Sequence, residues 1–93
     1  MKDANVQQYR LVLLNDETHS YGYVVALLRE IFGYDEHMAF ELTKAVDQEG
    51  RAVVYTGPYE HAEFKRDKVL DFGPDLQMPI SSGSMNCELE PVS

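Results

Sequence analysis

The stretch LVLLNDETHSYGYVVALLREIFGY, residues 11–34, carries the two patterns that decide the fold. Its beginning belongs to a mostly apolar run, residues 9–14, which contains no Gly or Pro and therefore predicts a buried strand. The run stops at Asn-Asp-Glu, residues 15–17, whose side chains favour turns and helix starts. Ser20 can then cap a helix that runs to about Phe32. The stretch thus predicts a strand, an acidic turn and a helix in direct succession.

Apolar spacing predicts two consecutive helices. In the first, the inward side chains recur at helical intervals, at Val24, Leu27, Leu28 and Ile31. Gly33 supplies its stop, and Asp35 can cap a second helix that continues to about Gln48 and ends at Gly50. The inner face of the second helix is expected at Met38, Leu42, Ala45 and Val46.

The second half of the chain repeats the alternation of strand and helix. Residues 51–56 (RAVVYT) predict a strand, and Gly57-Pro58 is expected to open a third helix. The side of this helix that faces the core is expected to hold Ala62, Lys65, Val69 and Phe72. After a loop over residues 74–83, alternation of apolar and polar residues over residues 84–90 predicts a strand with one buried face. Its inward residues would be Met85, Cys87 and Leu89.

The order β-α-α-β-α-β predicts an α+β fold in a single small domain. The economical arrangement is a three-stranded antiparallel sheet with the three helices packed on one face. Residues 1–8 are expected to form a flexible N-terminal extension, and residues 9–93 the core domain.

Charge and composition restrict the partners. The 93 residues carry a formal net charge of −8, which argues against nucleic acid and against an anionic membrane surface as the main partner. A cationic ligand or a basic protein surface fits better. With one cysteine, no signal peptide pattern and no membrane-spanning run, we expect a cytoplasmic monomer without an internal disulfide and without a cofactor.

Six segments of the chain, in order, resemble the ClpS family of ATP-dependent Clp protease adaptors. Residues 13–17 (LLNDE) correspond to the family's Leu-Leu-Asn-Asp-Asp, and residues 19–25 (HSYGYVV) to its Thr-Pro-Met turn and Glu-Phe-Val-Val helix start. Residues 60–65 (EHAEFK) correspond to Glu-Val-Ala-Glu-Thr-Lys. The other matched segments are residues 45–47 (AVD), 49–53 (EGRAV) and 87–90 (CELE).

The resemblance implies an adaptor rather than an enzyme. Such an adaptor binds proteins or peptides whose first residue is Leu, Phe, Tyr or Trp, the N-degron residues of the N-end rule. It delivers them to the N-domain of a Clp-family AAA+ unfoldase. Acceptance of Ile or Val is left open. Glu60 and Lys65 match the family's unfoldase-docking positions, whereas the short extension leaves delivery open.

The ligand's α-amino group is expected to bind acidic and amide side chains, three of them in the turn and one at the end of the second helix. An ammonium has three N–H donors and a positive charge, so it needs several acceptors, at least one of them anionic. By resemblance Asn15 and Glu17 supply acceptors, Asp16 assists or shapes the turn, and Asp47 stands where the family has histidine. Either Asp47 adds attraction and tolerates Glu17, or His19 pairs with Asp47 and partly neutralises it.

The apolar side chain of the ligand would enter a pocket whose walls, by resemblance, are His19, Tyr21, Val24, Thr43, Val46 and Met85. Tyr21 replaces a methionine that acts in the family as a gatekeeper against β-branched residues. The tyrosine could narrow the pocket or swing out and stack on an aromatic ligand. Together with His19 and Asp47, it suggests a divergent subfamily.

Other interpretations of the same residues remain open. Residues 15–17 could be a turn and helix cap only, and Glu60 and Lys65 an ordinary exposed pair. The pocket could serve an N-terminal-residue binder with altered specificity and no protease delivery, including an engineered recogniser. Two alternatives belong to other classes of protein. One is a structural module like the C-terminal domain of the ribosomal stalk protein, and the other is a metal-dependent enzyme. The enzyme would use Asp16, Glu17, His19 and Asp47.

Overall fold

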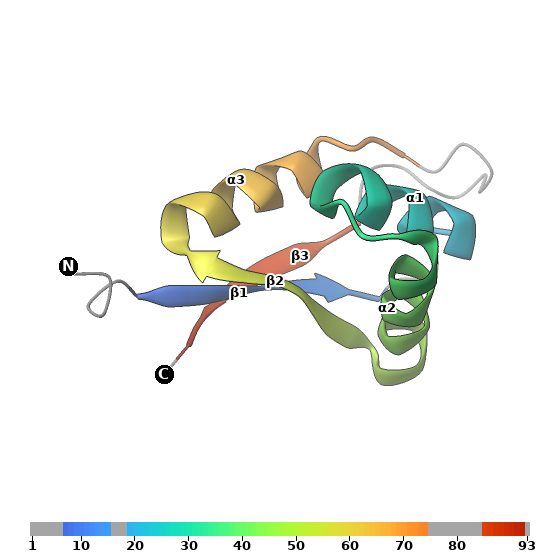
Figure 1. The fold of residues 1–93 in the computed structure, drawn as a ribbon, viewed down its shortest axis with the longest axis horizontal. Coiled ribbons are helices and arrows are strands. Elements are labelled where there is room, and N and C mark those ends of the chain that lie inside the picture. Colours follow the sequence, from blue (N-terminus) through green and yellow to red (C-terminus); the bar gives the residue numbers. More distant parts are fainter. Residues whose placement is uncertain (1–6, 16–18, 75–84, 93) are drawn as a thin grey trace.

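The computed structural model describes residues 7–15, 19–74 and 85–92, and its elements follow the predicted order (Figure 1). The strands are β1 Gln8–Leu14, β2 Arg51–Pro58 and β3 Cys87–Pro91. The helices are α1 Tyr21–Phe32, α2 Glu36–Glu49 and α3 Tyr59–Leu70. The predicted α+β class and β-α-α-β-α-β order are confirmed.

The three strands form one antiparallel sheet in the order β2-β1-β3. The apolar run that predicted β1 lies in the middle of the sheet, and its residues Leu11, Val12 and Leu13 are fully buried. The register between β1 and β2 shifts after Leu11, so that Val54 becomes the extra residue of a β-bulge. Because the strands are antiparallel, the end of β1 lies beside the starts of β2 and β3.

The first two helices, α1 and α2, begin and end where the sequence predicts. The Ser20 side chain accepts a hydrogen bond from the Tyr23 N–H at 3.2 Å, and the Asp35 side chain accepts one from Met38 at 2.8 Å. Gly33 (φ 75°) and Gly50 (φ 86°) end the helices in the left-handed conformation, which glycine adopts without the steric cost of a Cβ.

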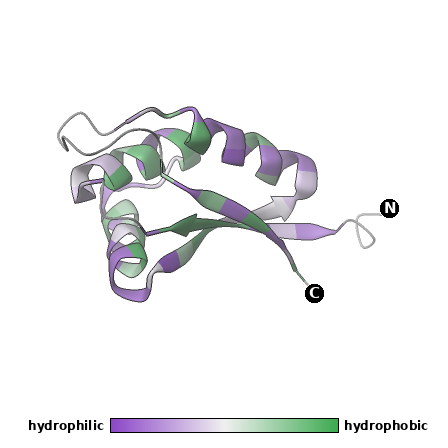
Figure 2. Cartoon of the chain, turned by 180° about the vertical axis from the view of Figure 1, so that it is seen from behind, coloured by the Kyte–Doolittle hydropathy of each residue, from purple (hydrophilic) through white to green (hydrophobic). Residues whose placement is uncertain are grey.

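All three helices pack on the same side of the sheet (Figure 1). α3 contacts each strand, α1 contacts both other helices, and α2 packs on α1 and β2. Figure 2 shows apolar residues concentrated along β1, whereas α3 is largely hydrophilic. The core therefore lies between the sheet and the inner sides of the three helices, with Leu11, Leu13, Leu27, Leu28, Val54 and Val69 among its buried residues.

The predicted inner face of α2 is partly wrong. Met38 is 45% exposed, and the buried residues of the helix are Ala39, Thr43 and Val46. The helix is thus rotated so that a stripe of small and β-branched side chains faces inward, at i, i+4 and i+7. These small side chains allow α2 to lie close against α1 and β2. Leu42 and Ala45 are half-buried at the edge of this stripe.

Gly57 and Pro58 end β2 rather than opening α3, which is a second correction. Gly57 is paired with Tyr9 and Pro58 with Gln8, so the sheet extends two residues further than predicted. Proline is tolerated there because β2 is an edge strand. Gln8, assigned to the flexible extension, likewise belongs to β1.

The last strand starts at Cys87 instead of residue 84. Met85 precedes it and is 1% exposed, while Cys87 and Leu89 are half-buried, as their alternation predicts. The predicted extension (apart from residues 7 and 8) and nearly all of the predicted loop lie outside the described residues.

Candidate functional site

A cavity of about 450 Å³ opens between the end of β1, the start of α1 and the last turns of α2. Its apolar or β-branched lining consists of Val24, Thr43, Val46 and Met85. Its polar and aromatic lining consists of Asn15, His19, Ser20, Tyr21 and Asp47. Three parts of the chain that are far apart in the sequence (residues 15–24, residues 43–47 and Met85) therefore contribute to one pocket.

Two backbone hydrogen bonds bring these segments together. The Asn15 N–H donates to the carbonyl of Gly50 at 3.0 Å, which ties the residue after β1 to the end of α2. The Leu14 N–H donates to the carbonyl of Asn86 at 3.0 Å, which places the segment containing Met85 on the other side of β1. The pocket is thus a consequence of the strand order, with β1 between its two partners.

The deep part of the pocket is apolar and well packed. Val24, Val46 and Met85 are between 1% and 5% exposed. The Thr43 hydroxyl donates to the carbonyl of Ala39 at 2.7 Å within α2, so its hydrogen-bonding need is met by the helix. This side chain can therefore present its methyl group to a ligand at no cost in unsatisfied polar atoms.

Asp47 and Tyr21 form the exposed part of the lining. The Tyr21 hydroxyl donates a hydrogen bond to Asp47 Oδ2 at 2.9 Å, which joins the first residue of α1 to the last turn of α2. This bond, together with partial desolvation and the nearby negative charge, raises the pKa of Tyr21 above its ordinary value. The Tyr21 ring also lies against Phe40 of α2, with 5.8 Å between the ring centroids.

His19 stacks on the wall of the pocket. Its ring centroid lies 4.5 Å from that of Tyr23, at an interplanar angle of 38°. Tyr23 is itself fixed, because its hydroxyl donates to the carbonyl of Gly73 and its ring meets Phe72 edge-on at 5.4 Å. Two aromatic contacts therefore connect the pocket to the segment that follows α3.

Each predicted pocket residue that the structure describes lies in this one cavity. These residues are Asn15, His19, Tyr21, Val24, Thr43, Val46, Asp47 and Met85. Asp16 and Glu17 lie outside the described residues. The sequence analysis missed Ser20 as a lining residue, since it assigned this side chain to capping alone, although its place between His19 and Tyr21 was a usable signal. It also considered His19 as a partner of Asp47 and Glu17 as a nearby like charge, and it did not consider the Tyr21 hydroxyl.

The two predicted docking residues differ in their surroundings. Glu60 is exposed in the first turn of α3, beside a second cavity of about 500 Å³. Lys65 is half-buried: its Nζ donates to the carbonyl of Ile31 at 2.8 Å and lies 5.6 Å from the centroid of the Phe32 ring. Lys65 therefore caps the end of α1, a local role that the sequence did not indicate.

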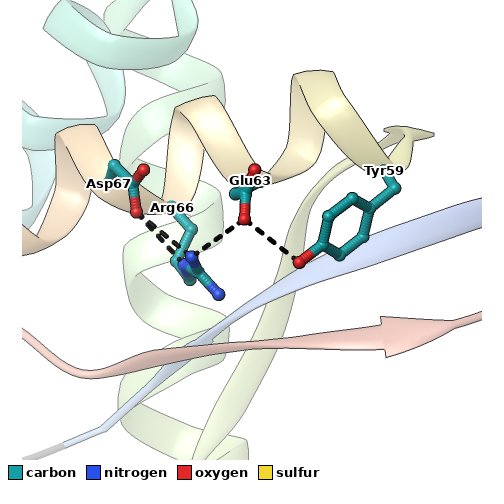
Figure 3. Close-up of polar contacts among 4 residues, drawn as sticks. All are labelled: Tyr59, Glu63, Arg66 and Asp67. Carbon is teal, nitrogen blue, oxygen red and sulfur yellow. Dashed lines mark hydrogen bonds and ion pairs between the residues drawn. The ribbon is translucent and has the colours of Figure 1, made fainter.

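A chain of polar contacts runs along α3 (Figure 3). The Tyr59 hydroxyl donates to Glu63 Oε2 at 3.1 Å. Arg66 lies 3.6 Å from Glu63 and 3.3 Å from Asp67. The bond to Glu63 is the main reason why the pKa of Tyr59 is raised. These contacts lie within a single helix and leave the arrangement of the other elements unchanged.

The described part of the chain contains no group of three or more His, Cys, Asp or Glu side chains placed to hold a metal ion. Burial raises the pKa of the Cys87 thiol to about 11, so this thiol stays protonated near neutral pH and is a poor nucleophile. Within the described residues no helix has the length and apolar character needed to cross a bilayer.

Comparisons with known proteins show the family to which the chain belongs. The family model described as "ATP-dependent Clp protease adaptor protein ClpS" matches residues 4–82. The ClpS adapter of Nautilia profundicola is 38% identical over 72 residues, covering 77% of this chain and 74% of that protein. The adapter of Roseobacter denitrificans is 38% identical over a match that covers 77% of this chain and 64% of that protein. The chain therefore belongs to the ClpS family of Clp protease adaptors.

A solved structure supports the fold independently. The structure of Agrobacterium tumefaciens ClpS2 bound to L-phenylalaninamide superposes with a TM-score of 0.81 at 24% sequence identity. The match covers 95% of this chain and 100% of that one. The arrangement of three helices on a three-stranded sheet is therefore that of ClpS proteins.

Proposed function

We propose that this adaptor binds the first residue of proteins that begin with a bulky hydrophobic amino acid and delivers them to a Clp-type AAA+ protease. In this proposal the free α-amino group binds at the polar end of the 450 Å³ cavity, and the first side chain enters its apolar part. Leu, Phe, Tyr and Trp are the expected first residues.

The observation that carries the proposal is the division of one pocket into two chemically different parts. Asn15 and Asp47 offer oxygen acceptors, one of them anionic, which suits an ammonium with three N–H donors. Val24, Val46 and Met85 offer a dry apolar surface. Only the first residue of a chain presents a positive charge and an unrestricted side chain on the same carbon atom.

The ligand of the related solved structure has the same two features. L-phenylalaninamide, which is bound to Agrobacterium tumefaciens ClpS2, carries a free α-amino group and a benzyl side chain. Its amide stands for the peptide bond to a second residue. A pocket in this chain that joins acceptors to an apolar cavity is suited to the same class of ligand.

The expected affinity follows from the two parts of the pocket. Burying about 150 Å² of an aromatic side chain contributes on the order of 4 kcal/mol. Charge-assisted hydrogen bonds to the ammonium contribute roughly 1.5–3 kcal/mol each. After the cost of association, a dissociation constant of about a micromolar is expected.

Delivery requires that the substrate and the unfoldase bind at the same time. The pocket lies at the end of β1, whereas Glu60 follows Pro58, which is paired with Gln8 at the start of β1. Seven residues of strand separate these two ends, a distance on the order of 20 Å. A partner that docks at Glu60 therefore leaves the pocket accessible. Because Lys65 is engaged by α1, Glu60 is the stronger docking candidate.

Fluorescence anisotropy with short labelled peptides that differ only in their first residue tests the binding part. The panel contains Leu, Ile, Val, Phe, Tyr, Trp, Arg and Ala, with N-acetyl-Phe as the control. Micromolar binding of bulky hydrophobic first residues, abolished by acetylation, is the expected result. Equal binding of all first residues, or indifference to acetylation, would contradict the proposal.

Degradation of a fluorescent protein with an N-terminal Phe, in the presence of a Clp unfoldase and its peptidase, tests the delivery part. Binding without faster degradation would support the second candidate function, a binder with altered specificity and no delivery. The observation that favours this candidate is the Tyr21–Asp47 pair, since both residues depart from the family pattern and contact one another.

A further inference from the structure

The hydrogen bond between Tyr21 and Asp47 joins two exposed side chains that both line the pocket. Its two residues are 26 positions apart in sequence and belong to different helices. Tyr21 is 39% exposed and Asp47 is also exposed, so a surface hydroxyl and a surface carboxylate meet at the entrance. A bond between two exposed side chains contributes little to the stability of the fold. Any larger effect of this bond is therefore expected in ligand binding at the pocket.

Asp47 needs an orienting contact if its charge is to act on a ligand. It lies in the last turn of α2, two residues before the helix ends at Glu49. An exposed aspartate samples several rotamers, and fixing one of them costs free energy each time a ligand binds. A donor that holds the carboxylate in the empty site removes part of this cost in advance.

Tyr21 is well placed to be that donor because its own ring is supported. The ring packs against Phe40, with 5.8 Å between the ring centroids. Phe40 lies about two turns before Asp47 on α2. Phe40 is 43% exposed, and Lys44 lies 5.7 Å above its ring. Phe40 thus packs outside the core, where it contacts the Tyr21 ring.

We propose that Tyr21 is a positioning residue for recognition of the α-amino group, because its hydroxyl holds the Asp47 carboxylate at the pocket entrance. The inference rests on the proposed function of the pocket. It assigns two tasks to one side chain: the ring lines the space for the first side chain, and the hydroxyl acts through Asp47 on the ammonium.

The hydroxyl is available for this task over the whole working range of the ligand. The contact with Asp47 raises the pKa of Tyr21 above its usual value of about 10. The ligand's α-amino group loses its proton near pH 8. The phenol therefore remains a donor wherever the ligand is an ammonium.

Tyr21→Phe is the direct test, since it removes one oxygen atom and keeps the ring. Affinity for free-amine peptides is expected to fall roughly five- to tenfold, the scale of one ordinary hydrogen bond, because the hydroxyl acts on the ligand only through Asp47. The fall should be the same for Leu, Phe and Tyr first residues, because the hydroxyl acts on the amino group that they share. Anisotropy titrations of the wild type and the variant measure both quantities.

A double-mutant cycle separates positioning from a general effect on the pocket. In an Asp47→Ala background, Tyr21→Phe should cause no further loss, since its hydroxyl then has no carboxylate to hold. Tyr59→Phe is a matched control: it also removes a hydroxyl that donates to an exposed carboxylate, that of Glu63, but outside the cavity (Figure 3). The control should leave peptide affinity unchanged.

The outcomes discriminate this inference from the proposed function. If the wild type fails to distinguish free from acetylated peptides, the proposed function fails, and the inference with it. If the wild type does distinguish them and Tyr21→Phe binds equally well, binds more tightly, or changes the ranking of first residues, only the inference is overturned. Tighter binding would mean that Tyr21 competes with the ligand for Asp47. Equal melting temperatures of the variants exclude a folding defect as the cause.

Discussion

Two tyrosines in this molecule make the same bond with different consequences. The Tyr21 hydroxyl donates to Asp47 at 2.9 Å, and the Tyr59 hydroxyl donates to Glu63 at 3.1 Å (Figure 3). The first pair links α1 to α2 across a cavity, whereas the second pair links two turns of α3. Hydrogen bonding raises the pKa of both phenols. Local chemistry is thus nearly equal, and the difference lies in which elements the bond connects.

The comparison extends to the two ends of the sheet. At the end that carries Tyr21, the residue after β1, the start of α1, the last turns of α2 and Met85 meet around one cavity with both polar and apolar walls. At the other end, Glu60 and Tyr59 line an open surface next to Gln7. The two cavities therefore lie at opposite ends of β1 and differ in their walls: the first combines acceptors with buried apolar side chains, whereas the second lies around Pro58 and Glu60. In the proposed function each end serves a different partner.

The largest difference between the two pairs should appear when each carboxylate is removed. Asp47→Ala is expected to weaken binding of free-amine peptides by about a hundredfold, since the anionic acceptor at the pocket is lost. Glu63→Ala should leave affinity within about twofold, because Glu63 does not line the pocket and its hydrogen bond and ion pair stay within α3. Anisotropy titrations of both variants measure the contrast.

Asp47→His refines this test, because it restores the acceptor type that the family uses at this position. The variant is expected to keep binding and to lose affinity below about pH 6.5, where histidine becomes cationic and repels the ammonium. Equal affinities of Asp47→Ala and the wild type would remove Asp47 from the site and leave Asn15 as the main acceptor among the described residues.

Raising the pH above 8 is expected to weaken binding less, for each pH unit, than Asp47→Ala does. It tests directly whether the ligand's ammonium is recognised. Both tyrosines have pKa values above their usual range, so each stays protonated as the pH rises through 8. Affinity should therefore fall by about tenfold per pH unit above 8 through loss of the ligand's ammonium alone. A peptide with an N-terminal trimethylammonium group keeps its charge and lacks N–H donors, so it should bind weakly at every pH. Tight binding of this peptide would show that charge alone is recognised.

The sequence predicted the architecture because its signals were local. The run at β1, the caps Ser20 and Asp35 and the glycines after α1 and α2 each act within a few residues, and the structure confirms them. The inner face of α2 was missed at Met38 because apolar spacing alone does not show that Ala39 and Thr43 allow closer packing. Pro58 was assigned to a helix start because nothing local shows that β1 extends back to Gln8 and pairs with it.

The candidate site was predictable only in part, for a related reason. The family resemblance selected residues one by one, and the structure places them together around one cavity. The bond from Tyr21 to Asp47 depends on the angle between α1 and α2, which sequence periodicity leaves undetermined. The bond from Lys65 to Ile31 likewise depends on how α3 lies against the end of α1.

The smallest expected effect is that of replacing Lys65, which was predicted to dock the unfoldase but hydrogen-bonds to α1. Lys65→Met keeps an apolar stem over Phe32 but removes the donor to the Ile31 carbonyl, so the last turn of α1 loses a hydrogen bond. The free energy of unfolding is expected to fall by about 1 kcal/mol. Lys68→Met is the matched control, because Lys68 lies on the exposed ring of Phe64 at 5.1 Å and should change stability by less than about 0.5 kcal/mol.

Urea unfolding midpoints of the Lys65 and Lys68 variants give both stability values, and peptide affinity should be unchanged in each. A loss of peptide affinity in Lys65→Met would show that the end of α1 transmits its position to Tyr21 at the other end of the helix. Unchanged stability, combined with weaker binding to the unfoldase, would instead return Lys65 to the docking surface. The two readouts therefore decide whether this side chain serves the fold or the partner.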